Sequence, residues 1–128
     1  MDNDIIQVVE KYKEVIHSHN KEDFYNLWSK NQRCSLISVT KKFIGVDEIY
    51  NNFLIGGIKR LYSNIDLISE SMEINKINDS LVIVIFKYHT ETISRETGEE
   101  GGIKGLETQV IIKKIMNGIV ACALLTIA

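Results

Sequence analysis

The second half of the chain is dominated by apolar runs that do not alternate with polar residues. Residues 81–86 are all apolar, and so are residues 119–125. A strand with one face in water should alternate apolar and polar side chains. The pattern therefore predicts strands that are covered on both faces. We expect three long strands in succession, at residues 80–95, 103–116 and 119–127.

The first half of the chain shows helical spacing instead. Residues three and four positions apart predict a helix over residues 4–18, with the stripe Ile5, Val8, Val9, Tyr12, Val15, Ile16 and His19. Asn20 is a good N-cap for a second, short helix, because Asp23 follows it in a capping-box position. A third helix is expected after Gly45, and Gly56 with Gly57 should break or bend it.

The remaining segments complete an α+β pattern. Residues 33–39 predict a strand with Cys34, Leu36 and Ser38 on one face, followed by a polar turn at residues 40–42. Residues 65–77 predict a more exposed strand, because one face is polar. Asn78 with Asp79 predicts a tight turn, and Asn117 with Gly118 predicts a type I′ hairpin. Helices followed by antiparallel strands favour helices folded onto one face of a sheet.

Composition narrows the function classes. The 128 residues are expected to form one domain, residues 1–128. The net charge of −2 gives no basic surplus for nucleic acid, and no apolar run is long enough to span a membrane. The acidic N-terminus is unlike a signal peptide, so we expect a cytoplasmic protein. Cys34 and Cys122 are expected to be buried thiols, and no metal site or cofactor is predicted.

This order of elements resembles the nuclear transport factor 2-like superfamily, in particular its SnoaL-like and ketosteroid-isomerase-like members. The markers are the helix segment 8–12, the helix–helix step at residues 20–28, the segment 45–49, the strand segment 86–88 and the 117–118 hairpin. The resemblance implies a cone-shaped, strongly curved antiparallel sheet wrapped round a long N-terminal helix, with two further short helices. It also implies a pocket at the wide end of the cone.

The ketosteroid isomerases provide a comparison residue by residue. In that resemblance Tyr12 matches the family tyrosine, and an ungapped register also places Gly45 on the family glycine. The position of the family's base then holds Leu36, which cannot accept a proton. The position of the second acid falls on Thr108, with Glu107 one residue away and expected to face the other side. Ketosteroid isomerase activity is therefore not expected.

Strand alternation predicts which side chains face the pocket. The sheet residues expected there include Leu106 and Val110, and the predicted ligand-binding residues are Tyr12, Trp28, Leu36, Ser38, Phe53, Val84, Phe86, Tyr88 and Thr108. The alternative is that these side chains simply fill the core. Tyr12 is the one weak candidate for a catalytic residue. His89 is expected on the opposite face of its strand.

The outer face of the sheet is expected to be apolar. Its predicted residues are Ile83, Ile85, Ile111, Ala121, Ala123 and Leu125. An exposed patch of this kind is larger than monomers usually tolerate, which favours a homodimer packed sheet to sheet.

The leading interpretation is a small dimeric domain whose apolar pocket binds a small hydrophobic molecule. One alternative is an isomerase, cyclase or dehydratase that uses Tyr12 on a polyketide- or steroid-like substrate. Another is a purely structural or interaction dimer. The residue types do not identify the ligand, and whether the pocket is open depends on its volume.

Overall fold

A computed structural model describes residues 3–30, 33–38, 41–116 and 119–127 of the chain, and beyond residue 114 it describes the backbone alone. The helical elements lie in the first half of the chain. They are α1 (Asn3–Ser18), α2 (Lys21–Leu27), the single turn α3 (Val46–Glu48) and the π-helix η1 (Ile49–Lys59).

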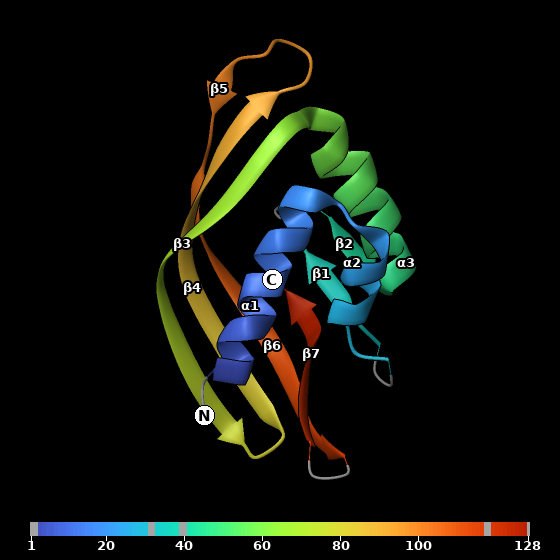
Figure 1. The fold of residues 1–128 in the computed structure, drawn as a ribbon, viewed down its shortest axis with the longest axis vertical. Coiled ribbons are helices and arrows are strands. Elements are labelled where there is room, and N and C mark those ends of the chain that lie inside the picture. Colours follow the sequence, from blue (N-terminus) through green and yellow to red (C-terminus); the bar gives the residue numbers. More distant parts are fainter. Residues whose placement is uncertain (1–2, 31–32, 39–40, 117–118, 128) are drawn as a thin grey trace.

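The described strands form one seven-stranded sheet in the order β2-β1-β7-β6-β4-β3, with β5 paired to β4. They are β1 (Ser35–Ile37), β2 (Lys42–Ile44), β3 (Tyr62–Asn78), β4 (Leu81–Ser94), β5 (Glu100–Gly101), β6 (Lys104–Met116) and β7 (Ile119–Ile127). All pairs are antiparallel except β1 with β7, which is parallel. The sheet curves around α1, and η1 lies on the other side of α1 from β3 and β4 (Figure 1).

The core lies between α1 and the concave face of the sheet. The predicted stripe of α1 is buried from Ile5 to Ile16, whereas His19, its last predicted member, lies beyond the end of the helix and is half-buried. The sheet contributes Val82, Val84 and Phe86, each at most 1% exposed. Burial of these side chains fixes the α+β architecture, because each provides roughly 1.5–3 kcal/mol of hydrophobic stabilisation. The predicted cone of antiparallel strands round an N-terminal helix is confirmed.

Several local predictions are also confirmed. Asn20 caps α2, since its Oδ1 accepts a hydrogen bond from the backbone N–H of Asp23 at 2.9 Å. The strand predicted to be more exposed is β3, which lies at the edge of the sheet with its polar face in contact with water. On β1, Leu36 is 2% exposed and Ile37 is 49% exposed, as alternation predicts. Cys34 is buried and forms no disulfide.

Other local predictions are wrong. The strand predicted at 33–39 is shorter, and Lys42, expected in a turn, begins the edge strand β2. Three residues are too few to produce a recognisable period, so β2 left no signal in the sequence. The connection at residues 96–102 contains the short strand β5. The 117–118 turn lies outside the described residues, although Met116 and Ile119 on either side of it are paired.

Gly56 and Gly57 do not break the third helix, which continues to Lys59 as the π-helix η1. A Cβ added at Gly56 would lie only 2.9 Å from the carbonyl oxygen of Asn51, five residues earlier. The missing side chain therefore lets the backbone close a wide helical turn that another residue would crowd. Long π-helices are rare and frequently occur at functional sites.

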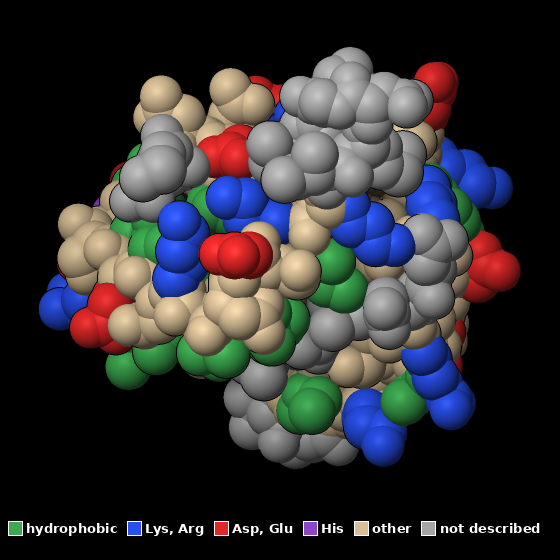
Figure 2. All heavy atoms as spheres, turned by 90° about the horizontal axis from the view of Figure 1, so that it is seen from below, with side chains coloured by type: hydrophobic (Ala, Val, Ile, Leu, Met, Phe, Trp, Pro, Cys, Tyr) green, Lys and Arg blue, Asp and Glu red, His purple; other side chains and the backbone are tan. Residues whose placement is uncertain are grey.

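The end of the molecule that holds the N-terminus and the β3–β4 turn carries side chains of both charges. Basic and acidic groups are interspersed among uncharged ones over this end (Figure 2). Among the described residues, no helix combines the length and apolar character needed to cross a lipid bilayer.

Candidate functional site

A cavity of about 740 Å³ opens between α1, η1 and the sheet. Its inner wall is built from buried side chains, which include Tyr12, Leu36 and Ile65. Its mouth is formed by the lining residues that are exposed, such as Ile37, Leu61, Ile103 and Leu106 on the apolar side. A largely apolar hollow with a few polar groups is typical of a small-molecule site.

Five of the nine predicted ligand-binding residues line this cavity. They are Tyr12, Leu36, Ser38, Phe53 and Tyr88. Trp28, Val84 and Phe86 do not line the cavity but are buried in the core. Trp28, for example, packs against Phe24 with ring centroids 5.8 Å apart. The structure thus separates pocket lining from core filling, two roles that the sequence left open.

The predicted orientation of β6 is wrong. Glu107 lies opposite Phe86 and Gln109 opposite Val84, and residues opposite each other on paired strands share a face. Because Phe86 and Val84 face the inside of the cone, Glu107 and Gln109 do so too. Thr108 and Val110 therefore face outward. Ile111, which we expected on the outer face, is fully buried opposite Val82.

This inversion places a carboxyl group in the wall of the cavity. Glu107 lines the cavity and is hydrogen-bonded on both of its oxygens. The hydroxyl of Tyr12 donates to Oε1 at 3.3 Å, and the side-chain N–H of Gln109 donates to Oε2 at 2.8 Å. Gln109 is fully buried, so the carboxyl is fixed from behind by a side chain with no access to water.

Burial controls the protonation of this cluster. Loss of hydration raises the pKa of Glu107 from 4.5 to about 7, although the hydrogen bonds from Gln109 and Tyr12 act in the opposite direction. Burial also raises the pKa of Tyr12 well above 10, and the charge of Glu107 adds to this effect. Near neutral pH the carboxyl therefore exchanges protons readily, whereas the phenol of Tyr12 stays protonated.

Tyr88 also lines the cavity near Glu107, and its position depends on Gly105. The two residues are opposite each other on β4 and β6. A Cβ at residue 105 would lie 2.8 Å from the Tyr88 hydroxyl oxygen, so only glycine leaves room for the ring. Burial and the nearby Glu107 charge raise the pKa of Tyr88, which keeps its hydroxyl as a donor.

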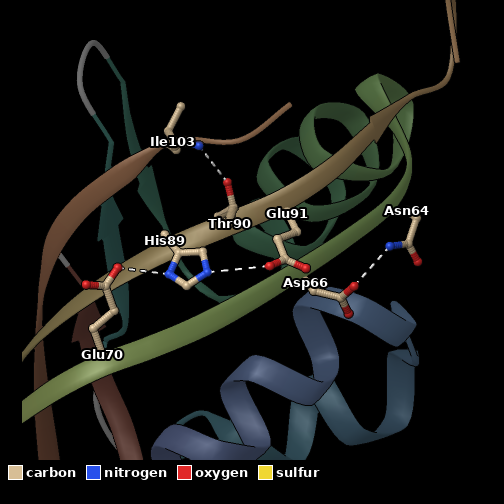
Figure 3. A network of polar contacts seen from close by, with 7 residues as sticks. All are labelled: Asn64, Asp66, Glu70, His89, Thr90, Glu91 and Ile103. Atoms are coloured by element: carbon tan, nitrogen blue, oxygen red, sulfur yellow. Dashed lines mark hydrogen bonds and ion pairs between the residues drawn. The ribbon is translucent and has the colours of Figure 1, made fainter. Parts of the chain in front are cut away.

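His89 lies away from the cavity, as predicted from alternation. Its Nδ1 is 2.8 Å from a carboxylate oxygen of Glu70, and its Nε2 is 3.6 Å from one of Glu91. Figure 3 shows His89 between these two carboxylates, while the neighbouring Thr90 is hydrogen-bonded to the backbone of Ile103. His89 therefore belongs to a surface network. Within the part of the chain that the structure describes, no group of His, Cys, Asp and Glu side chains is arranged to hold a metal ion.

Sequence reasoning missed Glu107 as a pocket residue and Gln109 as the buried side chain behind it. Apolar Leu106 and Val110 suggested that the even-numbered positions of β6 face inward. Glu107 and Gln109 face inward instead, and Leu106 lines the cavity only at its exposed mouth. The signal available was the strand pairing itself, because the register with Val84 and Phe86 decides which β6 residues share their face.

The fold is that of the nuclear transport factor 2-like superfamily, shown by comparison with solved structures. A superfamily member from Salmonella enterica serovar Typhimurium matches with a TM-score of 0.87 and 19% identity, over 98% of this chain and 87% of that one. The hexachlorocyclohexane dehydrochlorinase LinA-type3 from Novosphingobium barchaimii matches with a TM-score of 0.78 and 7% identity, over 98% and 82% of the chains.

A third solved structure, a putative scytalone dehydratase from Novosphingobium aromaticivorans, matches with a TM-score of 0.80 and 12% identity, over 98% of this chain and 79% of that one. The sequence matches no protein-family model, and a search of characterised proteins by sequence finds no match. At these identities the structural matches establish the fold, and the activity must be argued from the site.

Proposed function

We propose that this protein binds a small, largely apolar molecule in its cavity and catalyses an elimination or isomerisation by proton transfer at Glu107. The observation that supports this proposal best is the position of Glu107 in the cavity wall with a pKa of about 7. A group that is half-protonated near neutral pH can both accept and return a proton during one catalytic cycle.

The neighbouring side chains fit this role. In its ionised form, Glu107 removes a proton from a carbon atom of the bound molecule. The electron pair that remains forms a double bond, either by expelling a leaving group from the adjacent carbon or by moving into a conjugated oxygen. Once Glu107 is protonated, the Tyr12 hydroxyl no longer faces a charged acceptor and can donate to the substrate oxygen. This donor stabilises the developing negative charge.

The structural neighbours are in accord with this reaction class. By name, one is a dehydrochlorinase and another a putative dehydratase, and both terms denote eliminations. The similarity in fold raises the expectation of such chemistry but does not transfer residues between these proteins.

The test uses nitrobenzisoxazole, a small neutral molecule whose ring opens when a base removes its carbon-bound proton. The wild-type protein should accelerate this opening, and the rate should rise with pH with an apparent pKa of about 7. Glu107→Gln keeps the shape but removes the base, so the acceleration should fall at least about a hundredfold.

Glu73→Gln is the matched control, because Glu73 is exposed on β3 and does not line the cavity. It should leave the rate unchanged. An equal rate in wild type and Glu107→Gln would contradict the proposal, as would a pH profile with no inflection near neutrality.

A second candidate is binding without catalysis. It is favoured by Leu36, an apolar side chain in the cavity wall at the position where the resembling isomerases carry their base. Among the described lining residues, Glu107 is the one carboxyl group. Saturable binding of apolar probes with no rate acceleration by Glu107 would favour this second candidate.

A further inference from the structure

The mouth of the cavity is positively charged, although the net charge of the whole chain is negative. Lys41 and Arg60 are both exposed and both line the cavity. The chain as a whole has a net charge of −2, so two cations at one opening run against its overall sign. The one carboxyl in the described lining is Glu107, whose burial keeps it partly neutral near pH 7.

Both cations are available to a ligand. Within the described residues, the ion pairs involve other side chains, and neither Lys41 nor Arg60 has a carboxylate partner within 4 Å. Arg60 is nevertheless held in place, because its Nε donates to the carbonyl oxygen of Gly56 at 2.9 Å. That bond anchors the guanidinium against η1 through Nε. A positioned guanidinium is well suited to bind an oxyanion through two parallel hydrogen bonds.

The two ends of the cavity differ in charge and in burial. The inner wall is apolar and closed by Tyr12 and Glu107, whereas the mouth has two cations. We infer that the cavity takes an amphipathic organic anion, whose apolar body fills the interior while its carboxylate, sulfonate or phosphate group is held at the mouth by Lys41 and Arg60. This inference rests on the proposed function and adds the class of its ligand.

The experiment compares two fluorescent probes with the same apolar body. Anilinonaphthalene sulfonate carries an anionic group, and phenylnaphthylamine lacks it. Both become fluorescent in apolar cavities, and amide shifts of Gly56 and Gly57 in NMR spectra establish that they bind at this site. The wild-type protein should bind the sulfonate about tenfold or more tightly than the neutral probe, and added salt should reduce that preference.

The double variant Lys41→Gln with Arg60→Gln should lose about tenfold in affinity for the sulfonate and less than about twofold for the neutral probe. The neutral probe also reports that the variant is folded. The matched control is Lys11→Gln with Lys87→Gln, which removes the same charge from exposed positions that do not line the cavity. This control should retain the wild-type preference.

The outcomes separate the two proposals. If neither probe binds the wild-type cavity, the proposed function fails, and this inference fails with it. If both probes bind equally well and the double variant changes neither, the cavity binds apolar molecules but the anion site is refuted. A preference lost equally in the double variant and its control would also refute it, because the effect would then come from net charge alone.

Discussion

Glu107 is the residue on which the functional interpretation depends. It lies in the inner face of a sheet whose neighbouring positions, Val84 and Phe86, are fully buried and apolar. A carboxyl group in such surroundings is not explained by packing, because burial of an ionisable group is unfavourable. Gln109 beside it is polar and fully buried, whereas Glu107 itself is half-buried in the cavity wall. Two inward polar residues in succession indicate a site that has been kept for chemistry or binding at the expense of stability.

This unfavourable burial predicts how stability depends on pH. Because the pKa of Glu107 is raised in the folded state, its contribution to stability is fully present below about pH 4.5 and is lost as the pH rises through about 7. Glu107→Gln does not titrate. At about pH 8 this variant should therefore be more stable than the wild type, by up to about 3 kcal/mol.

Urea unfolding at several pH values measures this difference. The advantage of Glu107→Gln should shrink steadily toward acidic pH and vanish near pH 4.5. A variant that is less stable than the wild type at about pH 8 would show that ionised Glu107 stabilises the fold, contrary to our account.

At the scale of elements, β6 determines the character of the site. Its odd-numbered residues 105, 107 and 109 face the inside of the cone. Gly105 leaves room for Tyr88, Glu107 provides the carboxyl group, and Gln109 holds that carboxyl by a hydrogen bond. Gly105 supplies the space that Tyr88 occupies, since a Cβ there would contact the phenol. The strand thereby positions one donor on the neighbouring strand while carrying the carboxyl itself.

Gly105→Ala should displace the Tyr88 ring and reduce stability by about 1–3 kcal/mol, the usual range for overpacking. Probe binding in the cavity should weaken as well. The control is the same substitution in a Tyr88→Ala background, where the clash is absent. A double-mutant cycle by urea unfolding should show strong coupling between the two sites. Equal effects of Gly105→Ala in both backgrounds would mean that Tyr88 does not occupy this space.

Periodicity predicted the long elements well because each buries a complete face. The stripe of α1, the apolar run of β4 and the Asn20 cap are local signals, and the structure confirms them. The face of β6 could not be predicted in this way, because its pattern reads equally well in either orientation. That face is set by pairing with β4, where Glu107 lies opposite Phe86, more than twenty positions earlier in the chain. The sequence therefore predicted the wrong face of β6 for Glu107, because the separation of Glu107 from Tyr12 along the chain does not determine that face.

At the scale of the whole molecule, the outer face of the sheet has no role in the site described above. The outward residues Ile83 and Ile85 on β4 and Val110 and Ile112 on β6 are partly exposed in the single chain. Paired apolar residues on one open face favour packing against a second sheet. We propose a homodimer formed through this face. The sequence also predicted a sheet-to-sheet dimer, but it placed the buried Ile111 on this face, and the side chains of Ala121, Ala123 and Leu125 lie outside the described part of the chain.

Sedimentation velocity should show a dimer for the wild type, and Ile85→Lys should shift it toward monomer by placing a charge in the contact. Ile77→Lys is a suitable control, because Ile77 is 54% exposed near the end of the edge strand β3. A monomer for the wild-type protein at high concentration would contradict a dimer through this face.

The most direct test of the central claim is an NMR titration of the labelled glutamate carboxyl carbons, with the Glu107 signal identified by its loss in Glu107→Gln. Our account predicts that Glu107 titrates near pH 7, well above the ordinary glutamate value of 4.5. Binding of a ligand in the cavity should then shift this titration. A Glu107 pKa near 4.5 would mean that the carboxyl is hydrated and would contradict its role as a buried acid–base group.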